Sequence, residues 1–287
     1  MKKNGCRWIS ALLAGCAVLS LAGCSSGGAS SAAGSAAPAS AASRAGSQAG
    51  GADDVQKIVD RGVLNVGVKV DVPKFGYKDP STGKIDGFEI DIARAVAKDI
   101  LGDESKLKLE GVTAKTRGPL LDTGELDMDI CTFTITEERK KSYNFSEPYY
   151  TDGVALMVKK SAGYKSLADL NGKTIGVAQS ATSKDALVQA AKEKGITLNY
   201  SEFSTYPEIK AALSSGRVDC FSVDGAILAG YLDDSVEILP DRYAPQKYGV
   251  ATKLSNKGLA ARIDKVLKSL KDSGKIDELL KKWGLSQ

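Results

Sequence analysis

Short apolar runs alternate with helical patterns along most of this 287-residue chain, and this alternation constrains its fold more than any other feature. The run at 63–68 has the length and composition of a buried strand. Between residues 88 and 100, apolar side chains then recur at every fourth position, as on the buried face of a helix. Strands that alternate with helices predict an α/β fold with parallel sheets.

The alternation continues to the C-terminus and contains an internal repeat. Further strands are predicted at 107–109, 126–131, 174–178 and 218–223, and further helices at 119–123, 185–194, 207–213, 259–270 and 276–283. The segments Leu-Leu-Asp-Thr-Gly124-Glu-Leu-Asp127 and Ala-Leu-Ser-Ser-Gly216-Arg-Val-Asp219 lie 92 residues apart and join a helix end, a glycine, a branched residue and an aspartate. Two lobes of similar build explain this likeness, and chance is the alternative for one short match.

The N-terminus has the features of an export signal. Basic residues at positions 2, 3 and 7 precede an apolar stretch at 8–22, which is shorter than the roughly 20 residues that span a bilayer. The stretch ends in Leu-Ala-Gly-Cys24, which resembles the lipobox of bacterial lipoproteins. We therefore predict a lipoprotein signal peptide at 1–24 and lipidation of Cys24. The alternatives are an uncleaved anchor and a chance cysteine beside an ordinary cleavage site.

Residues 25–52 consist almost entirely of Ala, Gly and Ser and have no apolar period, so they cannot bury a core. As a flexible coil of this length, the segment has a reach of roughly 30 Å. We predict a tether that holds an extracytoplasmic body near the cell membrane through its lipid anchor.

Composition excludes several functions. The chain has no histidine, which removes Ser-His-Asp hydrolysis and every His-ligated metal site, and we predict neither a metal nor a cofactor. Three of its four net positive charges lie in the signal peptide and residues 53–287 are neutral overall, so no nucleic-acid partner is expected. Cys131 and Cys220 lie on separate strand patterns, and we expect two buried free thiols rather than a disulfide.

Polar residues follow the predicted strands, where ligands gather in open α/β sheets. Arg139 follows three threonines at a helix start, and a guanidinium there pairs both oxygens of a carboxylate. Asp224 ends a strand and suits an ammonium group. The alternatives are a surface arginine and a turn aspartate before a glycine. Lys69 and Arg117 are further cations here or ordinary surface charges.

Together these segments resemble the polar amino-acid-binding proteins of ABC importers, the bacterial solute-binding proteins of family 3, over residues 53–287. The strongest motifs are Gly-Phe-Glu-Ile-Asp91, Thr-Ile-Thr-Glu-Glu-Arg-Lys-Lys141, Tyr-Asn-Phe-Ser-Glu-Pro-Tyr-Tyr150 and Ser-Val-Asp224. Within the family, the stretches at 66–73, 115–121 and 238–240 look like those of the aspartate/glutamate-binding branch.

The resemblance implies a type II periplasmic-binding-protein-like fold, with two α/β lobes, a two-segment hinge and a ligand cleft between the lobes. Lobe 1 is expected at 53–152 plus 247–287 and lobe 2 at 153–246. The hinge segments are expected near 150–153 and 244–247. Closure of the lobes around the ligand then buries it.

The resemblance also assigns roles to residues. It implies that Arg139 binds the α-carboxylate of the ligand, together with Thr134 and the backbone of Thr132. It also implies that Asp224 binds the α-ammonium group. The remaining implied contacts are Ser180 and Thr182 on a facing loop, with Phe75, Tyr77 and Gln179 as the pocket wall.

Charge counting then favours an acidic ligand. Lys69, Arg117 and Arg139 face one carboxylate, and aspartate or glutamate balances that set best. We expect a monomeric, non-enzymatic binding protein that delivers these amino acids to an ABC permease. A glutamine-type ligand is the alternative if Lys69 points to solvent. Two further alternatives are a dehydratase and a surface adhesin or sensory subunit on the same fold.

Overall fold

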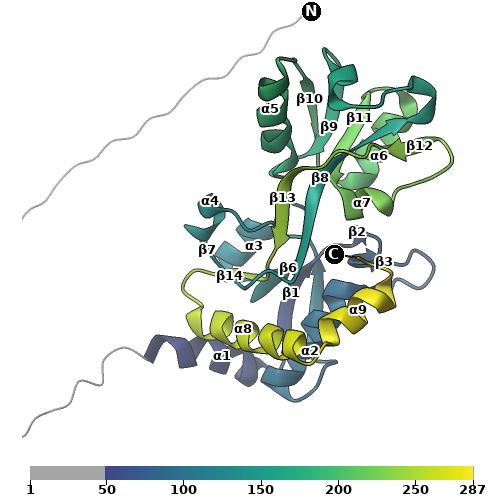
Figure 1. The fold of residues 1–287 in the computed structure, drawn as a ribbon. Helices are drawn as coiled ribbons and strands as arrows, with labels where there is room; N and C mark the ends of the chain where they lie inside the picture. Colours follow the sequence, from purple (N-terminus) through teal and green to yellow (C-terminus); the bar gives the residue numbers. More distant parts are fainter. Residues whose placement is uncertain (1–48, 287) are drawn as a thin grey trace, which may run out of the picture. The chain divides into compact units, whose positions relative to one another are not determined.

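The computed structural model describes residues 49–286 and has an α/β architecture with two main sheets (Figure 1). The first sheet has the strand order β5 (Leu107–Gly111), β1 (Leu64–Val68), β6 (Met128–Ile130), β14 (Ala251–Lys253) and β7 (Tyr143–Phe145). The second has the order β10 (Asn199–Phe203), β9 (Thr174–Ala178), β11 (Cys220–Asp224), β8 (Tyr150–Lys159) and β12 (Val236–Ile238), with β13 (Tyr243–Tyr248) also paired to β8. A small sheet contains β2 (Asp71–Val72), β3 (Gly76–Lys78) and β4 (Ile85–Asp86). The predicted signal peptide, most of the tether and Cys24 lie outside the described residues.

Helices pack on both main sheets. Around the first are α1 (Ala49–Arg61), α2 (Phe88–Leu101), α3 (Arg117–Thr123), α4 (Glu137–Lys140), α8 (Lys257–Asp272) and α9 (Lys275–Trp283). Around the second are α5 (Ser183–Lys194), α6 (Tyr206–Ser215) and α7 (Gly225–Ala229), with single 3₁₀ turns at Lys160–Ala162 and Leu167–Leu170. Helix α8 lies beside α1 and α2 (Figure 1). In the described part of the chain, no helix is long and apolar enough to cross a membrane.

The predicted strands and helices are present, but the sheets are mixed rather than purely parallel. Strand β1 runs parallel to β5 and β6, and β9 runs parallel to β10 and β11. Strand β14 is antiparallel to β6, and β8 is antiparallel to β11 and β12. Strand β8 carries the chain into the second sheet, and β14 follows the return of the chain to the first sheet.

The two predicted hinge segments pair with each other. Strands β8 and β13 are antiparallel and run side by side, with Thr151 opposite Lys247 and Asp152 opposite Gln246 (Figure 1). Strand β8 also pairs with β11 up to Asp224, at the position of Val154. The chain therefore enters and leaves the second sheet through one two-stranded ribbon.

The internal repeat is present in three dimensions. Gly124 and Gly216 end their helices with left-handed φ angles of 81° and 78°. The carboxylate of Asp127 accepts the backbone N–H of Asn65 in β1, at 2.8 Å. The carboxylate of Asp219 accepts the N–H of Thr174 in β9 at 2.9 Å. Both aspartates thus fasten the start of a strand to the neighbouring parallel strand.

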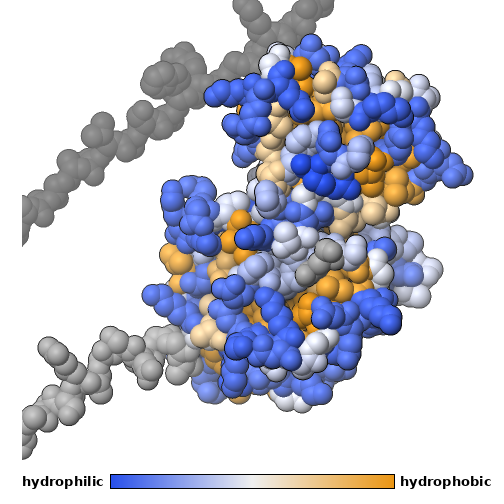
Figure 2. Space-filling view, in the orientation of Figure 1, coloured by the Kyte–Doolittle hydropathy of each residue, from blue (hydrophilic) through white to orange (hydrophobic). Residues whose placement is uncertain are grey.

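The cores under the helices are apolar. Buried hydrophobic residues form one large cluster that involves both main sheets and two smaller clusters. Cys131 and Cys220 are buried and free, as the sequence predicts. The face shown in Figure 2 is mostly hydrophilic with scattered hydrophobic residues, and large hydrophobics exposed by about half include Val188 and Leu232.

Gly87 is the glycine on which the start of α2 depends. It has a φ of 152°, and a Cβ there would lie 2.0 Å from the carbonyl oxygen of Phe75. We expect Gly87→Ala to lower the free energy of unfolding by about 2–4 kcal/mol in urea denaturation. The control is Gly83→Ala, where φ is 71° but no atom lies within 4 Å, and about 1 kcal/mol is expected. Equal losses would show that the clash at Gly87 is unimportant.

Candidate functional site

Arg117 is a buried cation at the start of α3. Its side chain is 4% exposed, and Nη1 donates to the carbonyl oxygens of Cys131 and Thr132, both at 3.2 Å. The guanidinium lies over the ring of Phe133 at 3.7 Å. Among the described residues, its Nε has no hydrogen-bond partner. The alternative of a surface charge is therefore wrong for Arg117.

Glu89 is a buried carboxyl group that the sequence analysis did not place in the site. Its Oε1 accepts the backbone N–H of Thr132 at 2.6 Å and the hydroxyl of Tyr149 at 2.5 Å. Burial raises the pKa of Glu89 to about 7, opposed by these two donors and by the charges of Lys69 and Arg117. The signal was present in the motif Gly-Phe-Glu-Ile-Asp91, because a glutamate at the buried start of a helix needs a compensating partner.

Arg139 connects the loop after β6 with the loop after β9. Its Nη1 donates to the carbonyl oxygen of Thr134 at 2.7 Å, and its Nη2 donates to that of Ser180 at 3.0 Å. Burial and the charge of Arg117 lower the pKa of Arg139 to about 9. The helix start is capped by Thr136, whose hydroxyl accepts the N–H of Arg139 at 3.1 Å.

The backbone around Arg139 is strained. Thr132 and Ser180 have φ angles of 51° and 61°, an uncommon region for residues other than glycine. Each lies two residues after the end of a buried strand, in loops where such strain often accompanies function. Thr134 is 5% exposed and forms an isolated bridge with Tyr248 of β13.

Asp224 ends β11 and is 4% exposed. Its Oδ2 accepts the hydroxyl of Tyr248 at 2.5 Å, so the ribbon of β8 and β13 holds the carboxyl group. Burial raises its pKa to about 7, and the Tyr248 hydroxyl opposes this rise. In the same region Asp152 accepts the N–H of Ala226 at 2.7 Å, which fastens the start of α7 to β8.

Lys69 does not point to solvent. Its side chain is 3% exposed, and Nζ lies 3.1 Å from Oδ1 of Asp71 and 3.3 Å from the carbonyl oxygen of Val112. Nζ also lies 4.6 Å from the ring centroid of Tyr206. Asp71 is the second charged residue that the sequence analysis missed, although an opposite charge only two positions from Lys69 was a signal for a pair.

The remaining predicted residues differ in their surroundings. The hydroxyl of Thr182 is 2.7 Å from Oε1 of Gln246 in β13, so this side chain does not cap α5. Oε1 of Gln179 is buried without a hydrogen-bond partner among the described residues.

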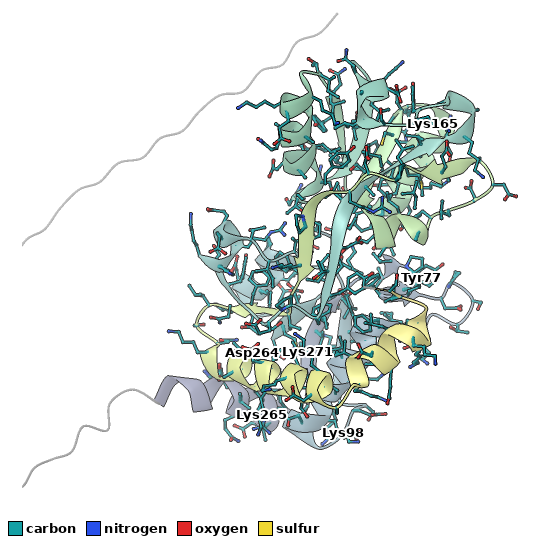
Figure 3. The ribbon with its side chains drawn as sticks, viewed as in Figure 1. Tyr77, Lys98, Lys165, Asp264, Lys265 and Lys271 are labelled. Atoms are coloured by element: carbon teal, nitrogen blue, oxygen red, sulfur yellow. The ribbon has the colours of Figure 1, made fainter. Side chains whose placement is uncertain are left out.

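The ring of Phe75 is fully buried and packs edge-on against Tyr150 at 5.1 Å. Tyr77 is 40% exposed on β3 (Figure 3). The pocket-wall role of Phe75, Tyr77 and Gln179 stays a prediction.

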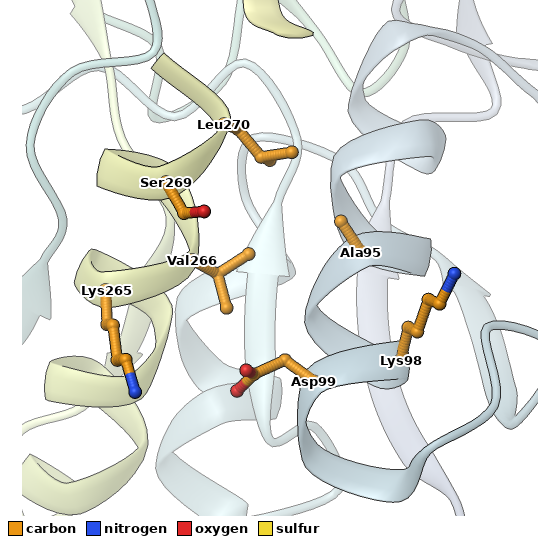
Figure 4. A pocket seen from close by; sticks show the side chains of 7 residues that line it. All are labelled: Ala95, Lys98, Asp99, Lys265, Val266, Ser269 and Leu270. Carbon is orange, nitrogen blue, oxygen red and sulfur yellow. The ribbon is translucent and has the colours of Figure 1, made fainter. Parts of the chain in front are cut away.

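A separate hollow of about 320 Å³ lies between α2 and α8 (Figure 4). Ala95, Lys98 and Asp99 line it from α2, and Lys265, Val266, Ser269 and Leu270 line it from α8. Asp99 is bound by Arg262, and the lining includes none of the predicted site residues. Across residues 49–286, no cluster of His, Cys, Asp or Glu has a composition able to hold a metal ion.

Known proteins similar to this chain are consistent with its buried charges at the strand ends and its two-stranded ribbon. Residues 64–286 match the model of the bacterial extracellular solute-binding proteins, family 3. This chain belongs to that family. Solute-binding proteins of this kind are amino-acid-binding components of ABC importers outside the cytoplasm, and the curated relatives are binding proteins rather than enzymes.

Two relatives are 40% identical to this chain over the aligned residues. One is the ABC transporter glutamine-binding protein GlnH of Bacillus subtilis, which aligns over 80% of this chain and 84% of its own length. The other is the glutamine-binding protein of Geobacillus stearothermophilus, which aligns over 85% and 91%. A solved ancestral arginine-binding protein bound to glutamine has a TM-score of 0.70 and 37% identity, covering 78% of this chain and 98% of that one. The fold is thus that of a type II periplasmic binding protein.

The pKa of Glu89 gives a testable pH dependence. The folded value of about 7 exceeds the ordinary value of 4.5, so unfolding releases a proton between these limits and stability falls as pH rises through them. We expect Glu89→Gln to remove this loss, up to about 3 kcal/mol between pH 4.5 and 7. Urea denaturation of the ligand-free protein at several pH values measures it. Glu104→Gln, at an exposed carboxylate, is the control, and parallel profiles for all three proteins would contradict the assignment.

Proposed function

We propose that this protein binds L-glutamine and delivers it to the membrane permease of an ABC importer. The observation that carries the proposal is the balance of buried charge at the site. Lys69 is paired with Asp71, and Glu89 lies under the influence of both Lys69 and Arg117. The relatives that are named glutamine-binding proteins support the same ligand.

This balance changes the expectation drawn from the sequence. That expectation counted three cations against Asp224 alone and therefore favoured aspartate or glutamate. Asp71 pairs with Lys69, and Glu89 lies close enough to Lys69 and Arg117 to interact with their charges. These cations are therefore already partly compensated within the protein, which favours a ligand side chain without a charge, because an uncompensated charge in a dry site is strongly unfavourable.

The α-amino-acid part of the ligand is assigned to the two lobes. Arg139 takes the α-carboxylate, with Thr134 and the backbone of Thr132 beside it. Asp224 takes the α-ammonium group, and Ser180 and Thr182 supply contacts from the loop after β9. The hydrogen bond from Arg139 to Ser180 supports this arrangement, because it already joins those two loops.

We propose lobe boundaries at 53–152 plus 247–287 and at 153–246. The membership of the strands in two sheets supports this division. Bending at the ribbon of β8 and β13 would open and close the site, since the chain passes between the two sheets there.

An acidic amino acid is the second candidate ligand. One observation favours it: Nε of Arg117 is buried without a hydrogen-bond partner among the described residues, so a second ligand carboxylate has an available donor. The two candidates differ in whether the ligand side chain is an amide or an anion.

Calorimetric titration of the chain from residue 25 with L-glutamine, L-glutamate, L-aspartate, L-arginine and L-cystine tests the proposal. We expect the tightest binding for L-glutamine. Tighter binding of either acid would establish the second candidate, and binding of none of the five would reject both.

Asp224→Asn is the sharpest single change in the proposed site. The amide keeps the shape of the side chain but removes the charge that faces the ammonium group. We expect the dissociation constant for the preferred amino acid to rise about 100-fold, which corresponds to about 3 kcal/mol. Asp234→Asn, at an exposed aspartate in the same lobe, is the matched control. Equal affinities for the two variants would contradict the role of Asp224.

We further propose that Cys24 carries the lipid that holds the protein at the cell membrane. Cys24→Ser removes the thiol that accepts the lipid, so the protein should move from the membrane to the soluble fraction in cells. Metabolic labelling with a radioactive fatty acid should label the wild-type protein and not the variant. Labelling of both proteins would reject Cys24 as the modified residue.

A further inference from the structure

We propose that Asp71 determines which ligand side chain this site accepts, because it holds the buried ammonium group of Lys69. The inference rests on the proposed amino-acid-binding function and deepens it. Asp71 would act as the residue that favours an amide over a carboxylate at the far end of the ligand.

The surroundings of Lys69 make a counter-charge necessary. Only 3% of its side chain is exposed, and its direct contacts are one carbonyl oxygen, one aromatic ring and the carboxylate of Asp71. Of these contacts, only the carboxylate carries a negative charge; Glu89 also interacts with Lys69 electrostatically but does not pair with it directly. A buried ammonium group without such a partner is strongly unfavourable, so Asp71 fixes the position and the charge of Lys69.

Elements of the second lobe hold Asp71 in place. Its Oδ2 accepts the backbone N–H of Tyr206 at the start of α6, at 3.4 Å, and its carbonyl oxygen accepts the hydroxyl of Tyr231 after α7. Pro73 lies against Gly230, where an added Cβ would come within 2.9 Å of the proline ring. These contacts join residues 71–73 to α6 and to the chain after α7, apart from the ribbon of β8 and β13.

An ion pair of this kind selects a primary amide. The amide oxygen accepts from an ammonium group while the amide nitrogen donates to a carboxylate, so glutamine satisfies Lys69 and Asp71 together. A ligand carboxylate would find the charge of Lys69 already compensated and would be repelled by Asp71. A site built around a donor and an acceptor discriminates against a group that lacks one of them.

The test compares the dissociation constants of L-glutamine and L-glutamate by calorimetry for the chain from residue 25. In Asp71→Asn the repelling charge is lost, but the side-chain oxygen that accepts from Tyr206 remains. We expect the preference for glutamine over glutamate to fall at least tenfold. The double variant Asp71→Asn/Lys69→Met should lose the gain in glutamate affinity, because the released cation is no longer present.

Two controls separate charge from folding and closure. Tyr231→Phe removes the interlobe hydrogen bond to the backbone of Asp71 without changing a charge, so it should weaken both ligands equally and leave their ratio unchanged. Asp103→Asn, at an exposed aspartate of the first lobe, should change neither constant. A ratio that shifts as much in Tyr231→Phe as in Asp71→Asn would overturn the electrostatic role.

The failure of this inference is distinguishable from failure of the proposed function. If the wild-type protein and Asp71→Asn both prefer glutamine and their ratios of the two dissociation constants agree within threefold, only the role of Asp71 is overturned. A wild-type protein that prefers glutamate overturns both the proposed ligand and the selection by Asp71. A wild-type protein that binds no amino acid overturns the proposed function itself.

Discussion

The cost of burying charge is the constraint on which this site depends. Lys69, Arg117 and Asp224 are each almost fully buried, and a lone ion in such surroundings is unstable. Each therefore has a partner: a carboxylate for Lys69, two carbonyl oxygens for Arg117 and a tyrosine hydroxyl for Asp224. These partners come from different elements, so the need to compensate charge also fixes how the loops at the strand ends lie.

The ribbon of β8 and β13 connects this constraint to the architecture. It carries the only paired strands through which the described chain passes between the two main sheets, and it also carries Tyr248, Asp152 and Gln246. These three side chains bind Asp224, the start of α7 and Thr182 respectively. In the function proposed here, a change in the angle of the ribbon would therefore move Asp224 and Thr182 and so connect ligand binding to movement of the lobes.

Most of the secondary structure was predictable, because apolar periodicity is a local property of the chain. The stripe on α2 and the run at β1 appear where the sequence predicts them. The predicted parallel sheets were only partly right. Strands β8, β12 and β14 run antiparallel to their neighbours, and the direction of a strand depends on where the chain returns, which periodicity does not encode.

The sequence by itself determined that Lys69 and Asp224 stand at strand ends and that Arg139 opens the helix after a strand, and ligands gather at such edges of α/β sheets. Only the tertiary structure decided which of the charges near these residues are already compensated. Glu89 reaches the site from the start of a helix 43 residues before its partner Thr132, and Asp71 is fixed through residues at 206 and 231. Burial and long-range pairing decide whether a charge faces the ligand or is already compensated, and both arise only when distant segments pack together.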